Sequence, residues 1–446
     1  MTHVGFFENL GWKKDKSGNS LEEVHRSVPV PKGLSFFGKL LAFSGPGYLV
    51  AVGYMDPGNW ATDLAAGSKF GYALLFVFLL SNLFAILLQH LSLKLGIATG
   101  RDLAQACHDS FSKPVRIFLW IMAEIMIIAC DLAEVIGSAI GLNLLFHIPL
   151  LFGVIITAFD VILLLALQEK GFRYLESLVI TLIGTVVLCF GVEIFLSQPV
   201  IHTLLIGFIP TPELIKNKEM LYIAIGILGA TVMPHNLYLH SAIVQTRDYG
   251  EEIEDKREAI KFSTIDSTIA LMIAFFVNAS ILIVAAAVFF KNGLNHVVEI
   301  EQAHHLLSPL LGTTLAGVVF ALALLASGQN STITGTLAGQ IIMEGFINIR
   351  LKPWIRRLIT RGIAVLPAIF VILLYGEGRL GQLLIFSQVL LSLQLSFAVF
   401  PLVSFTGNKK KMGVFVNGPL IQFASYAVAL VIAGLNIWLI VNTFVG

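Results

Sequence analysis

Two short stretches of this 446-residue chain carry side chains that could bind a metal ion. One runs from Asp56 through a proline and a glycine to Asn59, and the other begins with Met233 and a proline. Asp56 offers a hard anionic oxygen, Asn59 a neutral carbonyl oxygen and Met233 a soft thioether sulfur. Calcium and magnesium prefer oxygen ligands alone, whereas a thioether favours softer first-row transition metals. This donor set predicts a divalent transition metal, held by few protein charges and therefore releasable.

Each of these side chains also has a simpler interpretation. An aspartate beside a helix break is a common N-cap, and a methionine in an apolar segment more often fills a core than binds a metal. The metal interpretation of Asp56 and Met233 depends on both stretches occurring together.

A third stretch, AEIMIIACDLAEVIG, places three acids in one apolar segment. Asp131 and Glu134 are i, i+3 neighbours on one helix face, and Glu124 lies about two turns from Asp131. Ionisable groups inside a membrane are costly, so each is a functional hypothesis by default. The stripe predicts a proton path toward the cytoplasm. A purely structural ion pairing of Asp131 and Glu134 with a basic residue is the alternative.

Membrane-spanning helices must position all of these groups. The chain is 56% hydrophobic and only 13% charged, and its mean hydropathy is +0.84. Apolar runs of about 20 residues, long enough to cross a bilayer, recur along the chain. We expect an all-α polytopic membrane protein with about eleven transmembrane helices. The expected spans are residues 40–67, 71–98, 116–144, 148–168, 175–197, 220–246, 264–290, 308–346, 354–375, 380–405 and 416–443.

The distribution of basic residues fixes the expected orientation. With the N-terminus in the cytoplasm, 24 of the 29 lysines and arginines fall on cytoplasmic segments and 5 fall outside, as the positive-inside rule requires. An odd number of spans leaves the C-terminus outside. Residues 1–39 form a polar cytoplasmic tail rather than a signal peptide. Residues 40–446 form a single transporter domain, because its longest polar loops, at 198–218, 247–262 and 291–306, are short.

Two of the expected spans are interrupted in mid-membrane. Pro57 and Gly58 break the first span, and Pro234 breaks the sixth, because proline cannot complete the helical ladder. The breaks release backbone carbonyls, which we expect at Gly53 and Ala230. Since the breaks lie five spans apart, spans 1–5 and 6–10 are predicted to be inverted repeats. Paired interrupted helices of this kind indicate the midplane substrate site of a secondary transporter.

At these residues the chain resembles the NRAMP family of divalent metal transporters. DPGN at residues 56–59 and MPHN at residues 233–236 match the family's two signature motifs, and the resemblance extends from about residue 40 to the C-terminus. It implies a LeuT-like fold and proton-coupled import of manganese or ferrous iron, with cadmium as a common passenger. The eleven spans and the short tail are similar to those of a bacterial manganese importer. Met233 favours the manganese and iron branch, because magnesium-transporting members differ at this position.

The resemblance also implies roles for individual residues. The metal ligands would be the side chains of Asp56, Asn59 and Met233 with carbonyls near Gly53 and Ala230, joined by Gln388 in some conformations. The proton route would use Asp131, Glu134, His235 and an arginine of the ninth span, which we assign to Arg361 with Arg357 as the competitor. We add Glu124 from the acidic stripe, and Asp56 as a first proton acceptor.

Other functions and partners receive less support. A sodium-coupled amino-acid symporter on the same scaffold is the main alternative, although a fixed Asp56 would repel a substrate carboxylate. An intramembrane hydrolase would need a nucleophile with its base, or a metal held by a motif such as HExxH, and neither HExxH nor GxSxG occurs on the expected spans. A metal sensor would give no reason for the acidic stripe. Three cysteines at unrelated spacings imply no disulfide framework or permanent metal cofactor. A net charge of +1 does not suggest nucleic acid as a partner. We expect a monomer in the cell (inner) membrane.

Overall fold

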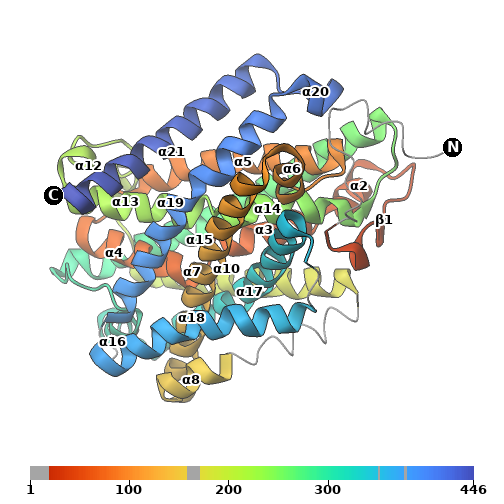
Figure 1. The fold of residues 1–446 in the computed structure, drawn as a ribbon. Coiled ribbons are helices and arrows are strands. Elements are labelled where there is room, and N and C mark those ends of the chain that lie inside the picture. Colours follow the sequence, from red (N-terminus) through yellow and green to blue (C-terminus); the bar gives the residue numbers. More distant parts are fainter. Residues whose placement is uncertain (1–19, 158–170, 350–351, 376–378, 446) are drawn as a thin grey trace.

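The computed structural model describes residues 20–157, 171–349, 352–375 and 379–445, which are almost entirely helical (Figure 1). Within these residues, eight helices are long and apolar enough to cross a membrane, or up to nine if one bent pair counts as a single span. The all-helical membrane class is confirmed, whereas the count of eleven stays a prediction.

The elements follow the chain in two similar series. The first series comprises α2 (Phe36–Phe43), α3 (Pro46–Gly53), α4 (Pro57–Phe70), α5 (Leu75–Thr99), α6 (Leu103–Ser110), α7 (Lys113–Phe146), α8 (Leu150–Thr157) and α10 (Phe172–Ser197). The short helices α11 (Ile201–Ile206) and α12 (Glu213–Lys216) connect it to the second. The second comprises α13 (Lys218–Thr231), α14 (Pro234–Ile243), α15 (Ile253–Val288), α16 (Ile300–Leu311), α17 (Thr314–Ile347), α18 (Pro353–Tyr375), α19 (Leu380–Thr406), α20 (Lys409–Met412) and α21 (Pro419–Val445).

Several expected boundaries were wrong. The span expected at 40–67 begins within α2, which is bent by 49° from α3. The loop expected at 247–262 is partly helical, because α15 already begins at Ile253. The span expected at 308–346 starts later, since α16 ends before Gly312, whose φ of +69° terminates that helix. Only the first part of the expected span 148–168 lies within the described residues, as α8.

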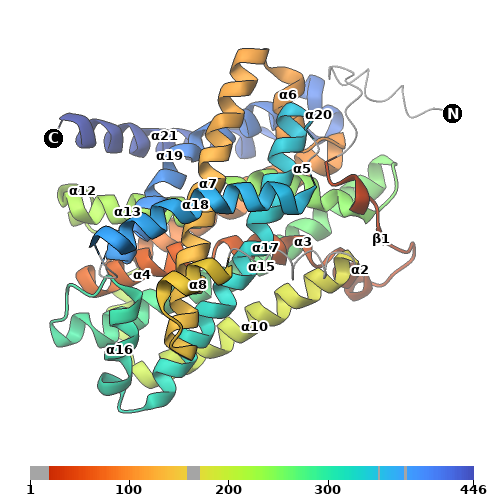
Figure 2. The same cartoon turned by 60° about the horizontal axis from the view of Figure 1, so that its bottom comes forward.

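The two interrupted helices run side by side through the middle of the molecule in opposite directions (Figures 1 and 2). Helix α4 packs against α13, and α3 packs against α14. Helix α21 lies at the edge of the bundle, where it contacts mainly α19. An antiparallel pair of broken helices at the centre is the arrangement that inverted repeats produce.

A buried ionic cluster holds the corner between α2 and α3. Arg247 donates to Glu176 Oε1 at 2.7 Å and to the Ser44 carbonyl at 2.6 Å. Asp266 accepts from the Gly47 N–H at 2.7 Å, and Arg173 also donates to the Ser44 carbonyl. The last carbonyls of α2 and the first N–H groups of α3 have no partners within their own helices. Arg247 and Arg173 of α10 donate to the carbonyls, and Asp266 of α15 accepts from the N–H groups.

The described part of the N-terminal tail lies against the same end of the bundle. Strand β1 (Val28–Pro29) pairs in parallel with β2 (Arg247–Asp248), which follows the second interrupted helix. Leu21 donates its N–H to Glu344 at the end of α17. In Figure 1, β1 and the end of α21 lie at opposite ends of the molecule.

Candidate metal-binding site

The first helix break is organised by Asp56, which is the N-cap of α4. Its backbone is extended (φ −66°, ψ 162°), and Pro57 occupies the first helical turn, where its missing N–H costs nothing. Asp56 Oδ1 accepts from the Asn59 backbone N–H at 2.8 Å and from Asn59 Nδ2 at 2.7 Å. The capping role is therefore real, but it occupies only one carboxylate oxygen. The other, Oδ2, lies 3.5 Å from Gln388 Nε2.

The carbonyls released at the end of α3 are bonded by side chains. Asn59 Nδ2 reaches the Gly53 carbonyl at 3.3 Å, Asn278 reaches the Tyr54 carbonyl at 2.6 Å, and Ser327 bonds the Met55 carbonyl. Irregular backbone at membrane depth is tolerated only when protein or a watery cavity satisfies it. The break is thus supported by α4, α15 and α17, and its Gly53 bond is the longest of the three.

The second break lies against the first. Met233 is the N-cap of α14 and is fully buried, and Ala230 belongs to the last turn of α13. Asn236, in the first turn of α14, donates to the Val50 carbonyl of α3 at 3.2 Å. A Cβ on Gly53 would meet Asn236 Nδ2 at 2.4 Å, so only glycine permits this approach.

Gln388 enters the same region from α19. A Cβ on Gly58 would lie 1.7 Å from Gln388 Nε2, and a Cβ on Gly229 would lie 2.3 Å from the Gln388 carbonyl. The two glycines therefore allow α19 to approach both broken helices. Every predicted ligand residue is buried in the described structure: Gly53, Asp56, Asn59, Ala230, Met233 and Gln388.

The donor set around the breaks is rich in neutral oxygens. In the part of the chain that the structure describes, Asn59 Oδ1, Asn236 Oδ1 and Gln388 Oε1 are buried without a hydrogen-bond partner. In that same part, no group of three or more His, Cys, Asp or Glu side chains could hold a metal. Asp56 and unpaired amide oxygens can bind a cation weakly, but they do not form a closed structural site.

The acidic stripe leads from the breaks into α7. Arg361 lies 3.5 Å from Glu134 Oε2 and donates to Thr332 at 2.6 Å, and all three side chains are fully buried. Cys130 Sγ lies 3.5 Å from Glu134 Oε1 and 3.9 Å from His235 Nε2. His235, Cys130, Glu134 and Arg361 therefore form a continuous chain of contacts.

The other residues predicted for the proton route differ in their burial and in their contacts. Asp131 is fully buried and close enough to His235 for their charges to interact. Glu124 is only partly buried and accepts from Trp120 Nε1 at 3.0 Å. Of the two candidate arginines, Arg361 pairs with Glu134, while the side chain of Arg357 lies outside the described residues.

Sequence reasoning missed several residues at this centre. Asp63, further along α4, and Cys130 on α7 are buried, and Asn278 and Ser327 support the first break. The spacing of Asp63, seven residues after Asp56, was a detectable signal of a shared helix face. No local pattern marks Asn278 or Ser327, because their partners lie more than 200 residues away in the chain.

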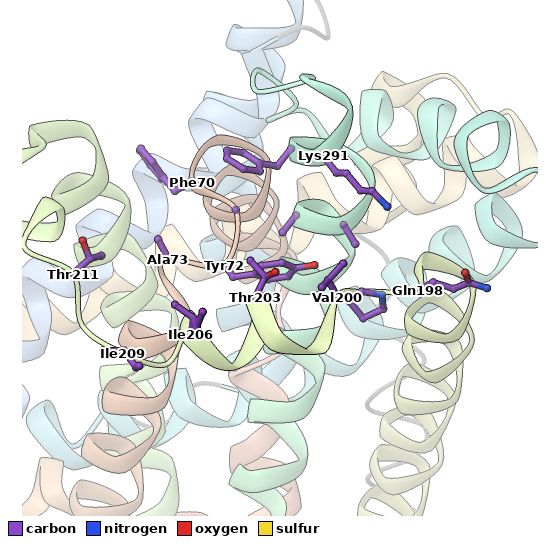
Figure 3. Close-up of a pocket in the computed structure, with 16 residues that line it drawn as sticks. Phe70, Tyr72, Ala73, Gln198, Val200, Thr203, Ile206, Ile209, Thr211 and Lys291 are labelled. Atoms are coloured by element: carbon purple, nitrogen blue, oxygen red, sulfur yellow. The ribbon is translucent and has the colours of Figure 1, made fainter.

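An apolar cavity of about 530 Å³ lies elsewhere, at the far end of α4 from Asp56. Its wall includes Phe70 and Tyr72, Thr203 and Ile206 from α11, and Lys291 after α15 (Figure 3). The length of α4 separates it from the breaks by roughly 20 Å. This cavity is not part of the candidate metal site.

Comparisons with known proteins agree with this geometry. The family model described as natural resistance-associated macrophage protein-like matches residues 47–442. The divalent metal cation transporter MntH of Listeria innocua is 62% identical over 432 residues, covering 97% of this chain and 96% of that protein. MntH of a Nostoc species is 61% identical over 427 residues, covering 96% and 97%. A crystal structure of the Eremococcus coleocola manganese transporter matches with a TM-score of 0.88 and 41% identity, covering 94% of this chain and 90% of that one.

A more distant match concerns the fold alone. Mhp1, a nucleobase-cation-symport-1 family transporter, matches with a TM-score of 0.57 at 14% identity over 90% of this chain and 94% of that one. Mhp1 has the LeuT-like fold, so this match confirms the expected architecture. The relatives are transporters, so the chain is not an enzyme. The family match and the relatives at about 60% identity identify the chain as a member of the NRAMP family.

Proposed function

We propose that this protein imports divalent transition-metal ions, Mn²⁺ in the first place and Fe²⁺ and Cd²⁺ in addition, together with protons, by alternating access. The observation that carries the proposal is the meeting of two broken helices around one carboxylate, Asp56, and buried neutral oxygens. The relatives named as divalent metal and manganese transporters support the same substrate class.

Metal binding would replace the hydrogen bonds of Asn59 with coordination of the ion by the same oxygen atoms. Asn59 Nδ2 now bridges Asp56 Oδ1 and the Gly53 carbonyl. A half-turn of the Asn59 amide would present Oδ1 instead, so that three oxygens face one cation. The Ala230 carbonyl and Met233 would complete the site from the second break, and Gln388 would join when α19 approaches. The thioether selects against Ca²⁺ and Mg²⁺, because it gives hard cations little.

Protons would leave by a separate route along α7. Asp56 would be the first acceptor, and His235, Glu134 and Arg361 already form a chain of contacts through Cys130. Asp131 would contribute beside His235, and Glu124 would continue the route toward the cytoplasm. The route avoids Met233, so metal and proton would share only the Asp56 carboxylate.

The proposed setting follows from the charge distribution. The protein would be a monomer in the cell (inner) membrane, with a cytoplasmic N-terminal tail of residues 1–39 and an external C-terminus. The single domain 40–446 would contain the whole transport path. No permanently bound cofactor is required, because the metal is the cargo and the proton is the coupling ion.

Manganese uptake into proteoliposomes that contain a pH dye tests the proposal. We expect uptake to rise with an inward proton gradient and to acidify the interior, and Asp56→Asn to abolish both signals. Metal uptake that ignores the gradient would refute proton coupling. An absence of metal uptake, with uptake of one member of an amino-acid panel, would favour the symporter instead.

A further inference from the structure

Asp63 is a buried acid that the proposed binding and proton steps do not use. It lies on α4 and is fully buried. Its Oδ1 accepts from Thr62 Oγ1 at 3.2 Å, while Oδ2 has no hydrogen-bond partner among the described residues. Burying an acid in a membrane segment with a single hydrogen bond costs free energy, so the presence of Asp63 suggests a function.

The position of Asp63 relates it to the metal site. Asp56, Asn59 and Asp63 are spaced i, i+3 and i+7 on α4, which brings all three to one helix face. The helical rise separates the two acids by roughly 10 Å along the axis. Asp63 therefore lies along the helix beyond the ligands, too far away to bind the same ion directly.

With a divalent ion bound, the site would carry more positive than negative charge, and Asp63 is a source of the missing negative charge. A divalent ion brings two positive charges, and Asp56 supplies one negative charge. Glu134, a buried acid of α7, is already paired with Arg361. Asp131 interacts with His235 on the α7 and α14 side. A net positive charge in a low-dielectric interior is unfavourable unless another group balances it.

We infer that Asp63 is the second, non-coordinating carboxylate that balances the charge of the divalent ion bound at Asp56, and that it thereby strengthens binding of divalent metals. Oδ2 is available for this role because the structure gives it no competing donor in the described residues. The inference deepens the proposed function and depends on it. In this proposal Asp63 does not coordinate the ion, and its negative charge stabilises the bound ion from a distance.

The test compares KM and maximal rate for Mn²⁺ uptake in proteoliposomes between the wild type and Asp63→Asn. The amide keeps the size of the side chain and an acceptor for Thr62 but removes the charge. We expect KM to rise about tenfold or more with a smaller change in maximal rate, because a unit charge at this distance acts on the bound ion. Asp63→Glu, which keeps the charge, should restore most of the affinity.

Thr62→Val is the matched control, because it removes the hydrogen bond to Asp63, together with the bond from Thr62 to the Asn59 carbonyl at 2.8 Å, and leaves the carboxylate. Its KM should stay within about threefold of wild type if charge is what matters. A KM of Asp63→Asn within that same range, or an equal rise in Thr62→Val, would overturn the inference. Elution and melting temperature in detergent show whether Asp63→Asn folds. If it does not fold, the KM of Asp63→Ser is compared with that of the wild type instead. No uptake by the wild type would instead refute the proposed function, and this inference would fall with it.

Discussion

At the scale of single residues, the site combines one charge with several neutral donors. Asp56 caps α4 with one oxygen and leaves the other near Gln388. As a metal site it would bind with moderate affinity, which suits the proposed transport because the ion must be released. Selectivity must then come from the chemistry of the neutral ligands, and Met233 is the only soft one proposed.

Met233→Ala should change selectivity more than it changes transport. We expect Mn²⁺ uptake to continue at a reduced rate, while Ca²⁺ and Mg²⁺ become effective competitors, because the thioether disfavours hard cations. The measurement is Mn²⁺ uptake in proteoliposomes against increasing Ca²⁺ or Mg²⁺. Unchanged competition curves would remove Met233 from the ligand set.

Glu134→Gln should separate metal movement from proton movement. The substitution keeps the shape of the side chain but removes the acid that contacts Cys130 and Arg361. We expect Mn²⁺ binding to persist, while the internal acidification that accompanies uptake falls about a hundredfold, the low end of what positioned acid groups contribute. Binding measured by calorimetry serves as the control. Normal acidification would make the Glu134–Arg361 pair purely structural.

At the scale of elements, close approaches between helices decide the geometry of the site. The broken helices meet α19 and each other at glycines, where a side chain would not fit. The corner between α2 and α3 is held by buried ionic contacts in addition to the apolar packing of Phe43. Both features can be tested by adding or removing a few atoms.

Gly58→Ala should displace Gln388, because the new Cβ would lie 1.7 Å from Nε2. We expect Mn²⁺ uptake to fall strongly, with a loss of about 1–3 kcal/mol in stability from overpacking. The matched control is Gly184→Ala in α10, where a Cβ meets nothing within 4 Å. The control should keep full uptake and an unchanged or slightly higher melting temperature. Equal behaviour of the two variants would contradict the close approach at Gly58.

Arg247→Ala should destabilise the corner between α2 and α3. Arg247 and Glu176 are almost fully buried, with side chains 1% and 2% exposed, and removing one partner of such a pair costs about 3–5 kcal/mol. Arg173→Ala is the control, because Arg173 contacts the same Glu176 but is 43% exposed, and partly exposed pairs contribute about 0–1 kcal/mol. Melting in detergent measures both variants. A similar fall in melting temperature for the two would show that burial does not set the strength of these contacts.

At the scale of the whole molecule, the two broken helices run side by side in opposite directions through the centre of the bundle. Helices α12 and α16 lie at the end where α21 finishes, and β1 lies at the other (Figure 1). The proposed orientation assigns the first end to the outside and the second to the cytoplasm.

Cysteine labelling tests this orientation. The three native cysteines are buried, so the background should be low. Lys216→Cys and Lys409→Cys replace exposed residues at the proposed outer and inner ends. An impermeant maleimide should label Lys216→Cys in intact cells and Lys409→Cys only after permeabilisation. The opposite pattern would invert the topology.

The sequence alone determined the class of protein, the two breaks and most of the helices. Apolar runs are local signals, and a proline interrupts a helix wherever it occurs, so neither needs tertiary information. The same reasoning proposed Asp56, Asn59, Met233 and the acidic stripe as candidate functional residues, and the structure shows them buried apart from the partly buried Glu124. It misjudged the starts of α15 and α17, because helix ends beyond the apolar runs depend on packing and turn conformation.

Only the tertiary structure decided which distant residues meet. Asn278 and Ser327 bond carbonyls of the first break, and Gln388 fits between Gly58 and Gly229. It also decided that Glu134 pairs with Arg361 and contacts Cys130, which links it to His235. These contacts join segments that are far apart in the chain, and hydrogen bonding and steric fit across packed helices leave no periodic trace in the sequence.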